Sequence, residues 1–207
     1  VERMIHFTSK DAMDIRGLGD ANIRKFHTLG WLSNIPSMYR LPYDQLKTME
    51  GFGAKSVANL QEAIEKSKAQ PLYRLINALG IRYVGETTAK TLAQAVDHLL
   101  DLSKKEKEEL QNIEDVGVKV AKSIYQYFHE ENNIAMIREL ESLGLNMIQT
   151  NTTAIDGNLA GLNFLFTGTL TQLKRAEAEA MVEARGGHIL GGVSSKLNYL
   201  VVGEDAG

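Results

Sequence analysis

The sequence contains no cysteine among its 207 residues, which excludes disulfide bonds, thiol nucleophiles and thiolate metal ligands within them. It has no apolar run near the roughly 20 residues that a bilayer-spanning helix needs, so we expect no membrane partner. Positive charge is not in excess either, because 23 lysines and arginines stand against 26 aspartates and glutamates. The net charge of −3 gives no general support for nucleic-acid binding, which must therefore rest on local arrangement.

Proline is scarce, and Pro36, Pro42 and Pro71 all lie in the first 71 residues. Helical patterning dominates as far as residue 143. Three stretches show it most clearly: 56–68, with Val57, Leu60 and Ile64 on one face; 103–110, opened by a serine cap with Glu106 in a capping box; and 133–143, with Ile134, Ile137 and Leu140 on one stripe.

The composition and the pattern of the sequence change after residue 148. Residues 149–158 are polar and turn-forming, and are typical of a linker. Beyond them the pattern predicts a strand at 164–167, a helix at 171–185 and strands at 188–190 and 199–202. This order indicates a small α/β unit.

The strongest signal is an internal repeat, aligned on Gly19, Gly53, Gly85 and Gly117 with spacings of 34, 32 and 32 residues. Four further columns are apolar in all four copies. These lie four before the glycine (Ile15, Met49, Ile81, Ile113), one before it (Leu18, Phe52, Val84, Val116), four after it (Ile23, Val57, Ala89, Ala121) and seven after it (Phe26, Leu60, Leu92, Ile124).

Each repeat is typical of a helix–hairpin–helix unit. A first helix ends near the apolar residue four before the glycine, and the glycine lies where the chain needs a positive φ or a close backbone approach. A second helix then begins at once, with free backbone N–H groups and a positive dipole end that favour phosphate. Four such units could hold phosphates of both strands without reading bases. The alternative is a helical repeat with tight turns and no ligand.

The residues around the turns are partly basic. Lys55 and Lys119 both lie two residues after the glycine, whereas Asp20, Glu86 and Glu114 bring negative charge close to it. The first two units keep a Gly-x-Gly, and the last two have Tyr83 and Asp115 at the position of its first glycine. We expect Asp115 to weaken phosphate contact at the fourth turn.

Particular segments resemble bacterial NAD⁺-dependent DNA ligases, namely residues 12–19 (AMDIRGLG), 75–89 (LINALGIRYVGETTA) and 166–170 (FTGTL) with Arg175 and Gly186–Gly187. The resemblance covers essentially the whole chain. It implies a mainly α fold of four tandem helix–hairpin–helix units, followed by a truncated, small α/β BRCT-like domain. It places the first domain at 1–148, with residues 1–10 leaving an absent zinc module, the linker at 149–158 and a partial BRCT domain at 159–207.

The resemblance also implies binding to the minor-groove side of nicked double-stranded DNA through phosphates. The residues it assigns to DNA binding are Arg16, Gly17, Gly19, Lys25, Gly51, Gly53, Lys55, Arg82, Gly85, Thr88, Lys90, Gly117 and Lys119. In the BRCT-like part, Thr167 and Gly168 stand where some BRCT domains hold a phosphate. The competing interpretation is that Thr167 caps or turns the chain and Gly168 serves the turn.

The family's reactive lysine belongs to a Lys-x-Asp-Gly motif, whereas the Asp156-Gly157 of this chain follows Ala154-Ile155. We therefore expect no catalytic residue, metal ligand or cofactor site here. The resemblance assigns NAD⁺, Mg²⁺ and a structural Zn²⁺ to the ligase's own N-terminal domains, which would be partners of this chain. It implies a role in replication and repair in the bacterial cytoplasm, at the nucleoid. Two alternatives stay open: another DNA repair protein with hairpins and BRCT, and a protein-interaction module.

Overall fold

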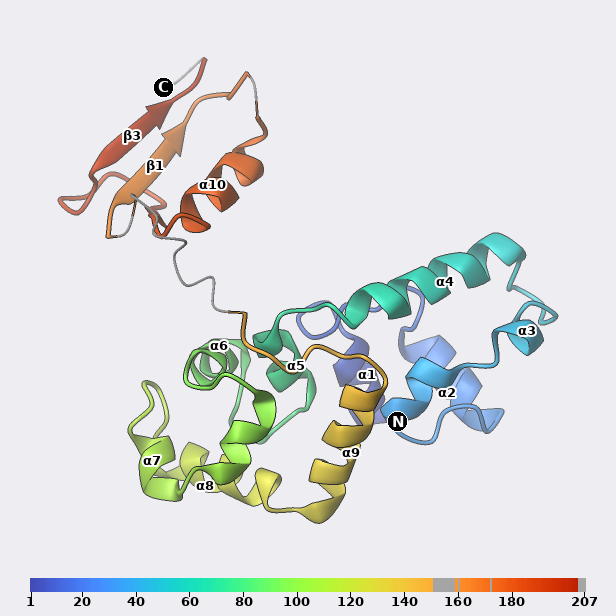
Figure 1. The fold of residues 1–207 in the computed structure, drawn as a ribbon. Helices are drawn as coiled ribbons and strands as arrows, with labels where there is room; N and C mark the ends of the chain where they lie inside the picture. The colour runs from blue at the N-terminus through green and yellow to red at the C-terminus, as the bar shows by residue number, and fades with distance from the viewer. Residues whose placement is uncertain (151–158, 160, 172, 205–207) are drawn as a thin grey trace. The chain divides into compact units, whose positions relative to one another are not determined.

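The computed structural model describes residues 1–150, 159, 161–171 and 173–204. The chain divides into two compact units, residues 1–149 and 150–207 (Figure 1). The first is helical, and the second contains a small parallel sheet with a helix. Most of the predicted linker, including Asp156-Gly157, lies outside the described residues.

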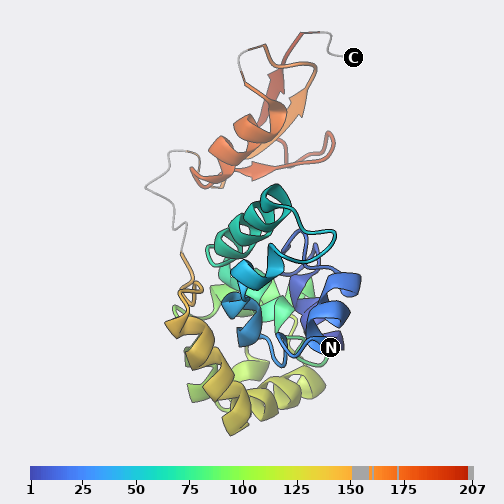
Figure 2. The same ribbon diagram turned by 90° about the vertical axis from the view of Figure 1, so that its right-hand side faces the viewer.

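The helical unit consists of short helices joined by tight turns. Its α-helices are α1 (Glu2–Thr8), α2 (Asp20–Thr28), α3 (Tyr43–Leu46), α4 (Ala54–Ser67), α5 (Leu72–Ala78), α6 (Glu86–Gln94), α7 (Lys107–Gln111), α8 (Val118–Phe128) and α9 (Glu131–Ser142), and its 3₁₀ helices are η1 (Pro36–Arg40) and η2 (Leu99–Lys104). Helix α5 packs against α1 and α6, α8 packs against α7, η2 and α9, and α9 returns to η1. In both views α4 runs along one side of this unit, with α8 and α9 on the opposite side (Figures 1 and 2).

The apolar columns of the repeat form the core of the helical unit. The residues four after each aligned glycine are fully buried, and so are the residues seven after it, apart from a 3% exposure of Leu60. Of the residues one before each glycine, Leu18, Val84 and Val116 are buried, and Phe52 is half-buried. Burial of these side chains therefore fixes each turn and the helix that follows it against the same core.

Two of the three expected helices have the predicted apolar faces, and one has a different start. Helix α4 buries Val57, Leu60 and Ile64, as predicted, and α9 buries Ile137 and Leu140 while Ile134 is half-buried. Ser103 does not cap a helix, because it lies within η2 and its hydroxyl donates to the carbonyl of Leu100. The N-cap of α7 is instead Glu106, whose backbone N–H donates to the side chain of Glu109 at 2.8 Å.

The second unit contains the predicted strand–helix–strand–strand order. Among the described residues, β1 (Asn163–Thr167), β2 (His188–Ile189) and β3 (Tyr199–Val202) form a parallel sheet in the order β2-β1-β3. Helix α10 (Arg175–Glu183) packs against β1 and β2. It begins later than predicted because Lys174 is its N-cap and Glu177 accepts from the backbone N–H of Lys174.

Glycines shape the turns of this second unit. Gly186, at φ +84°, and Gly187 donate their N–H groups to the last turn of α10, which confirms the predicted tight helix-to-strand turn. At Gly187 a Cβ atom would lie 2.5 Å from the Cγ1 of Val182, so a larger residue does not fit there. Within the described part of both units, no helix is long and apolar enough to span a membrane.

Candidate nucleic-acid interface

The four repeats share one turn geometry. In each, the backbone N–H of the residue before the aligned glycine donates to the carbonyl three residues earlier, at 3.0–3.2 Å. The third residue of this turn has a positive φ in all four copies: Gly17 (+89°), Gly51 (+87°), Tyr83 (+68°) and Asp115 (+64°). A left-handed third residue is the mark of a type II β-turn.

The left-handed residue is therefore not the aligned glycine. Gly19, Gly53, Gly85 and Gly117 have φ between −77° and −97°, in the extended region that any residue adopts. The first of the two explanations offered for these glycines, a required positive φ, is wrong, because the turn places that conformation two residues earlier. The remaining explanation is a close approach to the backbone.

Each aligned glycine is the N-cap of a helix: α2, α4, α6 or α8. Its carbonyl accepts the first helical hydrogen bond, at 2.9–3.0 Å. Across the described residues no side chain caps these four helices, and a Cβ atom at any of the four glycines would meet nothing within 4 Å. No side chain therefore covers the first backbone N–H groups at the side of the glycine, which faces open space.

The basic side chains near the turns differ in their surroundings. Arg16, Lys55 and Lys119 are exposed. Lys25 lies with its ammonium 5.3 Å from the ring centre of Phe52, which joins the first repeat to the second.

The third repeat holds its cations more tightly. The guanidinium of Arg82 lies 4.9 Å from the ring centre of Tyr83. Lys90 forms an ion pair with Glu86 at 2.9 Å, and this hydrogen bond lowers the pKa of Glu86 and raises that of Lys90. Thr88 is half-buried on the first turn of α6.

Charge alternates between successive turns, a pattern that the sequence reasoning missed. The residue three before the aligned glycine is Arg16, Glu50, Arg82 and Glu114 in turn, and the residue two after it is Ala21, Lys55, Thr87 and Lys119. The first turns of α4 and α8 contain no acidic residue, whereas α2 and α6 begin with Asp20 and Glu86. The acidic residue thus lies in the β-turn before α4 and α8, and in the first helical turn of α2 and α6, where it is closer to the free N–H groups. Comparing every second repeat would have revealed this signal.

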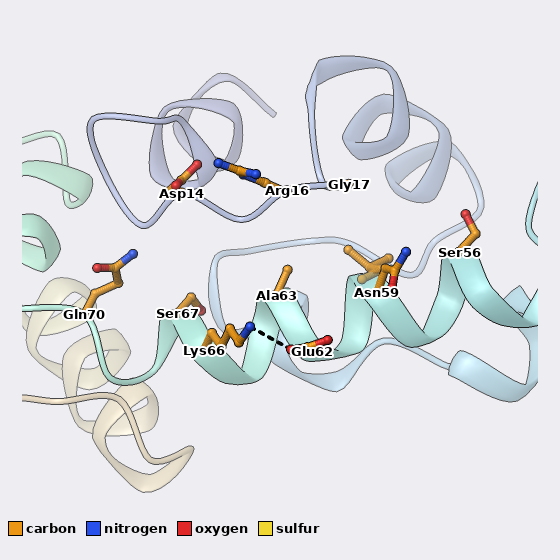
Figure 3. A pocket seen from close by; sticks show the side chains of 11 residues that line it. Asp14, Arg16, Gly17, Ser56, Asn59, Glu62, Ala63, Lys66, Ser67 and Gln70 are labelled. Carbon is orange, nitrogen blue, oxygen red and sulfur yellow. Dashed lines mark ion pairs between the residues drawn. The ribbon is translucent and has the colours of Figure 1, made fainter. Parts of the chain in front are cut away.

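Arg16 and Gly17 line a groove of about 660 Å³ that lies between the first turn and α4 (Figure 3). Ser56, Asn59 and Lys66 line its other side, where Lys66 is paired with Glu62 at 2.7 Å. Ser56, Asn59 and Lys66 are not among the residues predicted to bind DNA. The repeat would have indicated Ser56 and Asn59, because they lie three and six residues after Gly53, as Thr88 lies three after Gly85 and Lys25 six after Gly19.

In the second unit, Thr167 is the last residue of β1 and Gly168 follows it at φ +75°. A Cβ atom at Gly168 would lie 2.7 Å from the carbonyl oxygen of Glu204. The turn itself therefore requires this glycine. The guanidinium of Arg175 donates to the carbonyl of Gly168 at 2.7 Å, at one side of a groove of about 650 Å³.

The described side chains do not form a metal site, and the tryptophan belongs to the core. Within the part of the chain that the structure describes, no group of three or more histidines, aspartates and glutamates is arranged to hold a metal ion. Trp31 is half-buried with its ring centre 5.7 Å from that of Phe26, a packing contact of the core.

Known proteins match this chain in both units. A family model described as a helix-hairpin-helix motif matches residues 74–137, and the BRCA1 C Terminus (BRCT) domain model matches residues 156–207. Over all 207 residues the chain is 53% identical to a protein named DNA ligase from Sulfurihydrogenibium azorense, 52% to one from Persephonella marina and 42% to one from Aquifex aeolicus. It spans about 29% of the length of each. The chain is therefore similar, along its whole length, to one segment of proteins named DNA ligase, with a helix-hairpin-helix match followed by a BRCT match.

Proposed function

We propose that the helical unit binds nicked duplex DNA through its phosphates, independently of base sequence, as a non-catalytic part of an NAD⁺-dependent DNA ligase. All four turns act as helix–hairpin–helix units in this proposal, including the two that lie before residue 74. Such a segment would serve the sealing of nicks in replication and repair.

One observation carries the proposal: four helix starts have the same bare geometry. A turn that folds without strain at the aligned glycine, and leaves its Cβ direction empty, has no internal need for glycine. A phosphate oxygen can approach such a backbone to hydrogen-bonding distance of the N–H groups, and the helix dipole favours its charge. Contacts of this kind position a duplex without reading bases.

The exposed cations near the turns support the same proposal, although the chain is acidic as a whole. Lys55 and Lys119 are exposed on the first turns of α4 and α8, which contain no acidic residue, although Glu50 and Glu114 lie in the β-turns before them. Arg16 and Arg82 occupy one position in the first and third turns. Local positive charge beside free N–H groups can thus hold phosphates that a net charge of −3 would otherwise repel.

The part of this chain in ligation would be positional. We infer that the adenylation chemistry, with its NAD⁺, Mg²⁺ and a structural Zn²⁺, belongs to other segments of such a ligase, which would be partners of this chain. A cysteine-based zinc site needs ligands that this chain lacks. Holding the nicked duplex in register with a distant active site lowers the entropic part of the barrier.

The test is binding of the whole chain to nicked and intact duplexes of unrelated sequence across a salt series. We expect affinities that are similar for different sequences and fall steeply with salt, because phosphate contacts release counterions. Absence of binding at low salt would contradict the proposal for this segment. Binding that follows base sequence would contradict its phosphate-directed mechanism.

A further inference from the structure

Tyr83 has an unusual backbone for its side chain. Its φ of +68° lies in the left-handed region, where a bulky residue is an outlier, whereas Asp and Gly are tolerated. The corresponding positions of the other turns hold Gly17, Gly51 and Asp115. The turn can therefore be built with less strain by residues that the same chain uses elsewhere.

Packing does not explain the tyrosine. The side chain of Tyr83 is 54% exposed and belongs to the surface rather than to the core. The neighbours that fix this turn are Ile81 and Val84, which are buried, and the hydrogen bond between them. A strained residue that the fold does not need is a reason to look for a ligand.

The surroundings of Tyr83 suit a nucleic acid. The guanidinium of Arg82 lies over its ring, with 4.9 Å between the guanidinium carbon and the ring centre, so the exposed tip combines an aromatic face with a positive charge. Two residues later, Gly85 leaves the start of α6 bare. Aromatic faces stack on bases of any identity, while arginine beside them contacts phosphate.

We propose that Tyr83 packs its ring against a base or sugar exposed at the break of a nicked duplex, and so provides preference for nicked over intact DNA. A nick removes one backbone connection, so unstacking at that step costs less than in an intact duplex. The inference rests on the proposed function and adds to it the residue that recognises the nick. The other three turns, without an aromatic residue at this position, hold phosphates only.

The experiment compares the whole chain with its Tyr83→Gly, Tyr83→Phe and Asp115→Gly variants, on nicked and intact duplexes across a salt series. Tyr83→Gly relieves the left-handed strain, so we expect an unfolding temperature at least as high as that of the original chain. We expect its affinity for nicked duplex to be about tenfold weaker and its affinity for intact duplex to change little. The slope of log affinity against log salt should stay the same, because tyrosine is uncharged. Tyr83→Phe keeps the ring and should bind as the original chain does.

Asp115→Gly is the control for strain, because it relieves the left-handed backbone at φ +64° without removing an aromatic ring. It also removes a negative charge beside the fourth turn, so it should strengthen binding to nicked and intact duplexes alike. It should keep the nick preference. Nicked-duplex affinity of Tyr83→Gly equal to that of the original chain would overturn the inference, as would an original chain that binds both duplexes equally. In both cases salt-dependent binding would leave the proposed function standing. No binding of any duplex would instead refute the proposed function.

Discussion

The hydroxyl of Ser123 on α8 donates a hydrogen bond of 2.7 Å to the backbone carbonyl of Arg82, which joins the third turn to the helix after the fourth. Asn59 occupies the corresponding position on α4 and lines the groove beside Arg16. In each pair of turns, a polar residue at the same place of the later helix thus lies near the turn before it. This pairing matches the alternation of charge, since arginine is the second residue of the odd turns and lysine follows the even ones.

Lys55→Gln should weaken DNA binding to a similar extent for all sequences and lower the slope of log affinity against log salt by about one. The reason is that Lys55 is exposed at a helix start without acidic residues. Lys90→Gln is the matched control, because the ion pair with Glu86 already neutralises Lys90 and its loss should change the slope less. A salt titration measures both, and equal slopes for Lys55→Gln and the original chain would remove Lys55 from the interface.

Gly53→Ala should separate stability from binding. At φ −77° and with an empty Cβ direction, alanine should lower the free energy of unfolding by no more than about 1 kcal/mol, as at other N-caps. The new methyl group would keep a phosphate from the backbone. Loss of one charge-assisted hydrogen bond, about 1.5–3 kcal/mol, predicts at least a tenfold weaker affinity.

The comparison variant is Gly51→Ala, in the same turn but at φ +87°. It should lower stability by about 1–2 kcal/mol through left-handed strain. Denaturant unfolding and DNA titration would measure the two effects. Unchanged DNA affinity in Gly53→Ala would show that nothing approaches this backbone.

The buried hydroxyl of Tyr39 predicts a loss of stability at alkaline pH. Burial raises the pKa of Tyr39 to about 12, and its hydroxyl lies 2.9 Å from that of Ser67. The unfolded tyrosine loses its proton near pH 10, so between about 10 and 12 the unfolded state binds fewer protons than the folded one. The contribution of Tyr39 to stability is fully present below pH 10. Between about pH 10 and 12 the free energy of unfolding should fall by about 1.4 kcal/mol per pH unit.

Denaturant unfolding of Tyr39→Phe between pH 9 and 11.5 tests this effect. At neutral pH the free energy of unfolding of the variant should be about 1 kcal/mol lower, because the hydrogen bond to Ser67 is missing. Above pH 10 its free energy of unfolding should fall less steeply with pH than that of the original chain. Burial also raises the pKa of Tyr127 to about 12, so part of the decline should remain. Identical alkaline slopes for the variant and the original chain would contradict the assignment.

Gly168→Ala should destabilise the second unit alone. Its Cβ would lie 2.7 Å from the carbonyl oxygen of Glu204 and 2.8 Å from that of Gly203, on a backbone at φ +75°. We expect a loss of about 1–3 kcal/mol, typical of overpacking. Gly191→Ala is the control, because its Cβ would meet nothing within 4 Å. Hydrogen exchange should show faster opening of β1 and β3 only in the first variant, and equal protection in both would contradict the close contact.

The sequence alone determined the apolar frame of the helical unit. Four columns spaced around Gly19, Gly53, Gly85 and Gly117 predict the turns, the helices after them and side chains that the structure buries, apart from the partly buried Met49, Phe52 and Ile113. Such patterns can be recognised in a sequence because each helix must bury one face, which places apolar residues at a fixed spacing in every repeat. The same reasoning assigned the left-handed backbone to the wrong residue, since a Gly-x-Gly leaves two candidates and only the hydrogen bond of the folded turn selects between them.

The tertiary structure alone decided which charges are available and which turns lie together. Arg24 carries the same charge as Lys55 in the sequence, yet Glu2, 22 residues away, helps to hold Arg24 in an ion pair. Ser123 meets Arg82 across 41 residues. Coulombic and hydrogen-bonding contacts depend on distances of a few ångströms, which local periodicity does not determine. They are set only when the buried faces have packed.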